Sequence, residues 1–268
     1  MNGSFSRLFA SEWRKVRTTK MVWVLMGIAV IFSCMNVVAL ALVASGTIPG
    51  SPGALSGNLL LNPDYITTLL AQVGAAATFV LILGIIAMSG EYRHMTITST
   101  YLSTPRRGRV LVAKMGLFAI FGAVTAVIVT AIVVVVAAVV LSPFEHAPIT
   151  ASAIGSVLLG AVIGFALDAI VGVSLGALIK SQIAAVILAL VWILLIEALI
   201  SLLLPAVSKW LPGGALNSAM DVAVRADPTG GITAADRLPA WGGALVLLGY
   251  AVVFAAIASR TTLRRDIT

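Results

Sequence analysis

The stretch MGLFAIFGAVTAVIVTAIVVVVAAVVL, residues 115–141, decides the class of fold because it contains no charged side chain. A helix of ~20 apolar residues, rising ~1.5 Å per residue, crosses the ~30 Å hydrocarbon core of a bilayer. Val, Ala, Leu and Ile fill the run without the strict polar and apolar alternation of a membrane β-barrel. The stretch therefore predicts a membrane-spanning helix.

The whole chain has the composition of an integral membrane protein. Of its 268 residues, 60% are hydrophobic and 10% are charged, whereas soluble domains average ~25% charged residues. Similar apolar runs predict six spans, at about 21–44, 66–88, 115–141, 153–179, 183–204 and 241–259. The first run is too long for a cleavable signal peptide, so we interpret it as a retained helix. We expect one all-α transmembrane domain over residues 1–268, without a separate soluble domain.

Basic residues are distributed unevenly between the two sides that six spans define. Fourteen of the 17 fall on the side of the termini: Arg7, Arg14, Lys15, Arg17, Lys20, Arg93, Arg106, Arg107, Arg109, Lys114, Lys180, Arg260, Arg264 and Arg265. Only Lys209, Arg225 and Arg237 fall on the other side. The positive-inside rule then predicts a plasma-membrane protein with both termini and segment 89–114 in the cytoplasm. The net charge of +7 is explained by orientation, and we expect no nucleic-acid partner.

The N-terminal segment, residues 1–20, has a helical periodicity. Its apolar side chains recur at three- and four-residue spacing: Phe5, Leu8, Phe9, Trp13 and Val16. The basic residues Arg7, Arg14 and Arg17 fall mostly elsewhere on the helix. The pattern predicts an amphipathic helix on the inner leaflet with its basic face toward anionic headgroups. A simple basic anchor before the first span would explain it equally well.

The outer loop, residues 205–240, carries a second helical pattern. Leu216, Ala219, Met220, Ala223 and Val224 mark one face. This predicts a short interfacial helix that ends near Asp227–Pro228, because a residue before proline resists helical geometry. On the opposite side only residues 180–182 connect the fourth and fifth spans, which we therefore expect to be antiparallel neighbours.

The motifs of several enzyme classes are missing. There is no GxxxxGK[ST] phosphate loop, no HExxH motif and no cysteine–histidine cluster. The two histidines, His94 and His146, are expected on opposite sides of the membrane. Cys34 is the only cysteine, so no intramolecular disulfide can form. We expect a chain that is not an enzyme by itself and that binds no metal or cofactor.

Two acidic residues, Asp168 and Glu197, lie within the predicted spans. Asp168 precedes Lys180 by 12 residues, which places it roughly 18 Å from the inner boundary. A charge at this depth costs at least ~2.5 kcal/mol, and no Lys or Arg lies within the spans to pair with it. Each acid therefore belongs either to a translocation path or proton site, or to a structural hydrogen bond between helices. The pairs Gly160–Gly164 and Gly172–Gly176 predict close helix packing, within the chain or against a second copy.

Segment 90–114, GEYRHMTITSTYLSTPRRGRVLVAK, resembles the permease subunits of type-2 ABC exporters, especially the six-helix actinobacterial kind. The matching features are Gly90-Glu91, Met95-Thr96, a short helix at 97–102, Pro105-Arg106-Arg107 and Lys114. Met95 departs from the family, where glycine is common. Residues 11–23 resemble the family's N-terminal elbow, and residues 175–200 and 203–215 resemble its fourth and fifth spans and outer loop. The resemblance covers nearly the whole chain.

The resemblance implies a mechanism of alternating access. Two permeases, identical or paralogous, would pair, each with a separate ATP-binding subunit that holds ATP and magnesium. The helix at 97–102 would dock in a cleft of that ATPase, and the elbow residues Trp13, Arg14 and Arg17 would move with it. The predicted coupling residues are Glu91, Tyr92, Arg93, Thr96, Ile97, Thr98, Thr100, Tyr101, Leu102, Pro105, Arg106 and Arg107. The arginines of this segment would pair with the ATPase or with lipid headgroups, or would serve topology alone.

Two other functions are compatible with the residues. The chain would be a proton-coupled secondary transporter if Asp168 and Glu197 carry protons, although it shows no clear internal repeat or interrupted helix pair. Alternatively, it would anchor or regulate a partner without transporting anything. For an exporter, the apolar composition is compatible with drugs, lipids and other amphiphiles alike.

Overall fold

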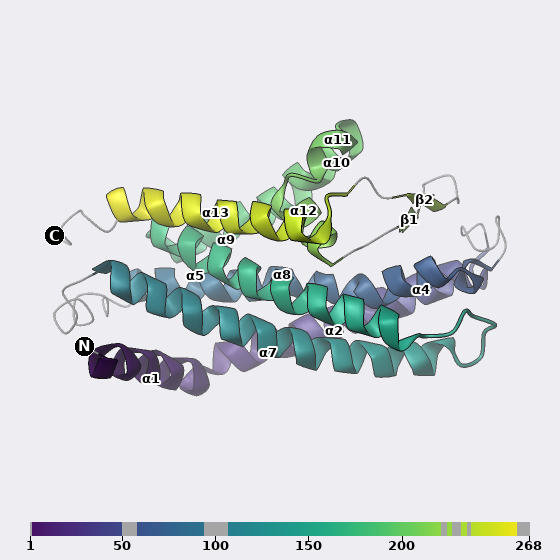
Figure 1. The fold of residues 1–268 in the computed structure, drawn as a ribbon, viewed down its shortest axis with the longest axis horizontal. Helices are drawn as coiled ribbons and strands as arrows, with labels where there is room; N and C mark the ends of the chain where they lie inside the picture. The colour runs from purple at the N-terminus through teal and green to yellow at the C-terminus, as the bar shows by residue number, and fades with distance from the viewer. Residues whose placement is uncertain are drawn as a thin grey trace.

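The computed structural model describes residues 2–49, 58–93, 107–220, 224–226, 232–234 and 237–261. Within these residues, six helical segments are long and apolar enough to cross a membrane. They are Lys20–Ala44, Pro63–Arg93, Gly108–Leu141, Ala151–Leu178, Gln182–Leu203 and Ala240–Arg260. The segments run side by side as a bundle (Figure 1). The predicted class, an all-α membrane bundle with an N-terminal elbow helix, is confirmed.

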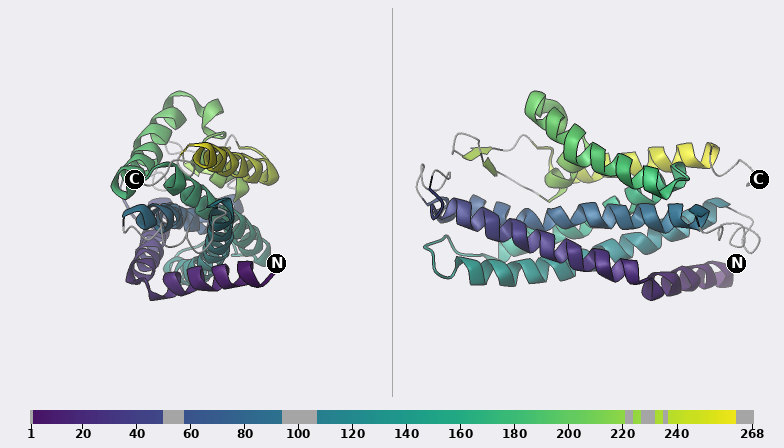
Figure 2. Two further views of the ribbon diagram at one scale, coloured as in Figure 1. Left: turned by 90° about the vertical axis from the view of Figure 1, so that its left-hand side faces the viewer. Right: turned by 180° about the vertical axis from the view of Figure 1, so that it is seen from behind.

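The N-terminal part forms two helices, α1 (Asn2–Thr18) and α2 (Lys20–Ala44). Thr19 between them has an extended backbone, which interrupts the helix, and its hydroxyl donates to the carbonyl of Lys15 over 2.6 Å. In the end-on view of Figure 2 the long helices point toward the viewer, while α1 runs across them. We call α1 the elbow helix, and the end of the bundle where it lies the elbow end.

The second span is built from several pieces. It follows the 3-10 turn η1 (Leu59–Leu61) and consists of α4 (Pro63–Leu70), the 3-10 segment η2 (Ala71–Ala76) and α5 (Ala77–Arg93). Asn62 caps its start by accepting a hydrogen bond from the backbone N–H of Asp64, and Pro63 is tolerated there because the first helical turn needs no donor. The helical segment extends past residues 66–88 at both ends.

The next three spans are α7, α8 and the interrupted helix α9–η3–α10. Their bounds are α7 Arg107–Leu141, α8 Ala151–Leu178, α9 Gln182–Val191, η3 Trp192–Ile196 and α10 Glu197–Leu203. The element α7 begins eight residues before the predicted span, so it starts beyond the apolar run. The element η3 is a π-helix, and α10 diverges from the bundle beyond it (Figures 1 and 2). After the turn at 179–181, α9 packs mainly against α5.

The segment after α10 forms small elements and the last span. These are α11 (Pro205–Ser208), α12 (Pro212–Ala219), the antiparallel strands β1 (Val224–Ala226) and β2 (Ile232–Ala234), and α13 (Ala240–Arg260). The predicted short helix is present as α12, but its predicted end near Asp227 is wrong. The helix ends at Ala219, since Leu216 and Met220 are buried against α8 and Val224 pairs with Ala234 in the strands.

The central helix is α8, which packs against α7, α5 and α13. Its glycines allow backbones to approach closely. A Cβ on Gly172 would lie 2.2 Å from the carbonyl oxygen of Leu81 in α5, and one on Gly176 would lie 2.5 Å from that of Ile85. Gly160 faces the backbone of Met220 in the same way, and Gly164 faces the side chain of Leu216. Both glycine pairs therefore pack within the chain.

The described basic residues gather at the two ends of the bundle. The start of α2, the end of α5, the start of α7 and the end of α13 lie at the elbow end with α1 (Figure 1). These elements and the turn after α8 carry Arg14, Lys15, Lys20, Arg93, Arg109, Lys114, Lys180 and Arg260. The grouping is the one that the charge count predicted. The predicted coupling helix at 97–102 lies outside the described residues.

Candidate functional site

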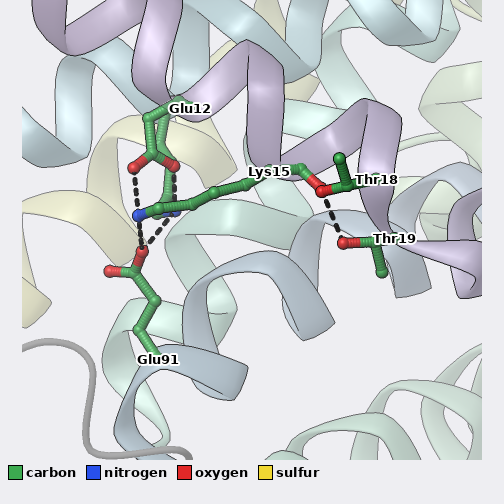
Figure 3. A network of polar contacts seen from close by, with 6 residues as sticks. Glu12, Lys15, Thr18, Thr19 and Glu91 are labelled. Carbon is green, nitrogen blue, oxygen red and sulfur yellow. Dashed lines mark hydrogen bonds and ion pairs between the residues drawn. The ribbon is translucent and has the colours of Figure 1, made fainter.

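A cluster of four charged side chains joins the elbow helix to the second and third spans. Lys15 of α1 donates to Glu12 Oε1 over 2.5 Å and to Glu91 Oε1 of α5 over 2.8 Å. Lys114 of α7 donates to Glu91 Oε1 over 2.9 Å and also to Glu12 Oε2. Figure 3 shows Lys15 reaching between the two carboxylates. We call these four residues the ion-pair cluster.

The ion-pair cluster is buried. The side chains of Glu12 and Lys114 are each 2% exposed and Glu91 is nearly as enclosed, whereas Lys15 remains 47% exposed. Two carboxylates and two ammonium groups make the cluster neutral, which is the condition under which buried charges are tolerated. Three of the four carboxylate oxygens in the cluster accept hydrogen bonds. The fourth, Oε2 of Glu91, has no hydrogen-bond partner among the described residues.

The electrostatics of the elbow helix follow from this arrangement. Burial acts to raise the pKa of Glu12, but the charge of Lys114 and the hydrogen bonds from both lysines outweigh it and hold that pKa below its usual value. Burial likewise acts to lower the pKa of Lys15, and the hydrogen bonds to Glu12 and Glu91 raise it above its usual value. The ion pairs thus favour the charged forms of Glu12 and Lys15.

Local structure explains why these side chains meet. Glu12 and Lys15 are three residues apart on one helix, so they project from the same face. Val16 continues that face into the core, while Trp13 and Arg14 are exposed on the other side of α1. Glu91 lies within the last turn of α5. Lys114 lies two helical turns into α7, because that helix begins at Arg107, before the apolar run.

The predicted coupling residues are placed unevenly. Glu91 belongs to the ion-pair cluster, Tyr92 packs partly buried against the core, and Arg93 ends α5 with an exposed side chain. Arg107 begins α7. Outside the description fall Thr96, Ile97, Thr98, Thr100, Tyr101, Leu102, Pro105 and Arg106, and the side chains of Arg17 and Arg107.

Three members of the ion-pair cluster were not predicted as site residues. Lys114 was interpreted as an orienting charge and as the lysine that ends the family motif, and Lys15 as an orienting charge. Glu12 had no role, although it is the only acid among the first twenty residues and follows the helical spacing to Lys15. That isolated acid in a basic segment was the one available signal.

The intramembrane acid Glu197 has structural partners. Its Oε1 accepts a hydrogen bond from the indole N–H of Trp192 over 2.9 Å, and its Oε2 accepts one from the backbone N–H of Gly213 over 2.9 Å. Glu197 therefore links the π-helix η3 to the start of α12. A Cβ on Gly213 would lie 2.3 Å from Oε2, so a larger residue there would require the carboxylate of Glu197 to shift.

The other intramembrane acid, Asp168, is buried on α8. It lies close enough to Glu197 for the two carboxyl groups to interact electrostatically. No hydrogen bond to its side chain occurs within the part of the chain that the structure describes. The structure thus brings the two predicted intramembrane acids, which lie on different helices, near each other.

The six apolar helices and the elbow define a multi-pass membrane protein. A family model described as ABC-2 family transporter protein matches residues 8–196. This range covers most of the chain, from the elbow helix through η3, so the chain belongs to the ABC-2 transporter family as a permease component. A search of curated proteins found no match.

Proposed function

We propose that the chain is the membrane-spanning subunit of an ABC exporter that works with a separate ATP-binding subunit. Two permease chains, identical or paralogous, would associate with two ATPase chains, which hold the ATP and magnesium. The elbow end would face the cytoplasm, in keeping with its basic residues. The substrate would be a drug, lipid or other amphiphile moved outward by alternating access.

The observation that carries this proposal is the ion-pair cluster. Glu91 and Lys114 stand on either side of the predicted coupling helix at 97–102 in the sequence. Glu91 is bonded to the elbow helix through Lys15, and Lys114 is bonded to it through Glu12. A push on the coupling segment would therefore reach α1, α5 and α7 together. Buried ion pairs resist separation because each charge left alone is costly, so the three helices would move as a unit.

Glu91 Oε2, which has no hydrogen-bond partner among the described residues, supports a second arrangement of the cluster. A buried acceptor without a partner costs ~1–3 kcal/mol. A conformation in which Oε2 gains a donor would recover that free energy and offset part of the cost of rearranging the helices. A partner that binds ATP can shift the bundle from one arrangement to another only if the two arrangements have similar free energies.

Assembly with an ATPase is the direct test. The tagged chain is purified from its native membrane, and the co-purifying proteins are identified by mass spectrometry. We expect a protein with a phosphate-loop motif, whose yield falls when Tyr101→Ala and Leu102→Ala are introduced together in the coupling segment. The exposed Trp241→Ala at the opposite end is the control and should leave the yield unchanged. Recovery of no ATP-binding protein would overturn the proposal.

Energy dependence separates the exporter from a proton-coupled transporter. Efflux should stop on ATP depletion and should continue when the proton gradient is collapsed. Asp168→Asn should retain ATP-dependent transport, because an exporter driven by ATP does not need Asp168 to carry a proton. Transport that survives ATP depletion and is lost in the Asp168→Asn variant would support the proton-coupled function instead.

A further inference from the structure

A cavity of about 660 Å³ opens beside the ion-pair cluster. Its walls come from four parts of the chain: the elbow helix, the start of α2, the last turns of α5 and the start of α7, with Gln182 at the start of α9. Nothing in the proposed transport mechanism requires a ligand at this position. The cavity therefore needs its own account.

The lining of the cavity is polar at the level of the ion-pair cluster and apolar further along the same helices. Lys15 and Arg93 lie at the polar level, and Val22, Leu83 and Phe118 line the interior. Leu83 precedes Arg93 by ten residues on one helix, so the lining extends roughly 15 Å along α5 at 1.5 Å per residue. This gradient matches an amphiphile that stands upright at the boundary between headgroups and acyl chains.

The charges of the lining favour an anionic headgroup. The lining contains three basic residues, Lys15, Arg93 and Lys114, and two acids, Glu12 and Glu91. Both acids are neutralised by the lysines of the ion-pair cluster, so the net charge is one positive. Arg93 is exposed, and the ammonium of Lys15 makes two bonds to carboxylates while carrying three N–H donors. Donors thus remain for a phosphate.

We infer that this cavity binds an anionic phospholipid of the leaflet at the elbow end. The phosphate lies between Lys15 and Arg93, and one acyl chain follows Val22, Leu83 and Phe118. A free phosphate compound would occupy only the polar level of the cavity and leave the apolar part empty, so the acyl chain supplies part of the affinity through burial of apolar surface. The inference concerns binding to this chain and stands independently of the ATPase partner.

Native mass spectrometry of the purified chain with phosphatidylglycerol tests the inference. One basic residue near an anionic lipid surface contributes ~1 kcal/mol, so Arg93→Gln should weaken retention of phosphatidylglycerol about fivefold. Arg14→Gln is the matched control, because Arg14 is an exposed arginine at the same end that does not line the cavity. It should leave retention within about twofold of the unmodified protein. Glycerol 3-phosphate should not displace the lipid.

A second variant tests the apolar part of the cavity. Ala87 lies in the lining, and Ala87→Phe would fill the space beside Leu83 and exclude the acyl chain. This variant should reduce the retention of phosphatidylglycerol although Arg93 is unchanged. A thermal unfolding scan verifies that the variant is folded. Equal losses for Arg93→Gln and Arg14→Gln would show diffuse attraction only and would overturn the inference. Equal retention of phosphatidylcholine, or displacement by glycerol 3-phosphate, would overturn it as well.

Discussion

Replacing Lys114 with methionine tests the energetics of the ion-pair cluster. The change keeps an unbranched side chain of similar length but removes the ammonium group that bonds both Glu12 and Glu91. Two buried carboxylates would then share the half-exposed Lys15. Breaking a buried ion pair by removing one partner costs ~3–5 kcal/mol, because the remaining charge is uncompensated. We expect a loss of this size in the free energy of unfolding.

The assay is equilibrium unfolding in mixed micelles, followed by tryptophan fluorescence. A loss of ~3–5 kcal/mol corresponds to a change of about 100-fold to several thousand-fold in the unfolding equilibrium. Lys180→Met is the matched control, because Lys180 is a lysine at the same end with an exposed side chain. Exposed charges contribute little, so this variant should lie within ~1 kcal/mol of the unmodified protein.

A compensating variant sharpens the test. Adding Glu12→Gln to Lys114→Met removes one carboxylate and leaves Lys15 paired with Glu91, so the cluster is neutral again. The double variant should recover a large part of the lost stability, since complete removal of a buried pair is far less costly than removal of one partner. The reasoning would be refuted if Lys114→Met and Lys180→Met were equally stable. It would also be refuted if the double variant were less stable than Lys114→Met.

Two further predictions concern helix packing and pH. Gly172→Ala should destabilise the protein by ~1–3 kcal/mol, because the new Cβ would meet the backbone of α5 at Leu81. Gly155→Ala on the same helix has open space and should be neutral or slightly stabilising. Thermal unfolding in detergent compares the two variants, and similar losses of stability would contradict the packing argument. The lysines beside Glu12 outweigh its burial and hold its pKa in the folded protein below the usual value of 4.5. Its contribution to stability is therefore present above pH 4.5 and is lost as the pH falls through the folded value. The stability difference between the unmodified protein and Glu12→Gln should therefore shrink below pH 4.5, and a difference that does not change with pH would show that the charge of Glu12 contributes nothing.

Much of the architecture follows from short-range patterns. An apolar run such as residues 115–141 has one stable form in a bilayer, because a helix satisfies all of its backbone hydrogen bonds internally. Clusters of basic residues at the ends of such runs then group the segments by side. For this reason the six spans, the elbow helix and the gathering of charge at one end were predictable from the sequence.

The candidate site was predicted only in part, because its contacts are long-range. Glu12 and Lys114 are 102 residues apart, and no local spacing indicates that they meet. Lys114 within the sequence has the pattern of an orienting charge, and only the early start of α7 at Arg107 and the path of α1 across the bundle bring it to Glu12. Similarly, Glu197 was recognisable as an intramembrane acid, but its bond to Gly213 depends on where α12, which packs against α13 and α8, places that glycine.

The sequence by itself therefore determined the class of protein, the spans and the grouping of basic residues at the elbow end. Hydrophobic length and charge asymmetry decide these features, and both are sums over neighbouring residues. Only the tertiary structure decided which charges pair, which glycines face which backbone and where a cavity remains. Those features depend on the relative positions of helices that are distant in the chain, and packing between helices sets those positions.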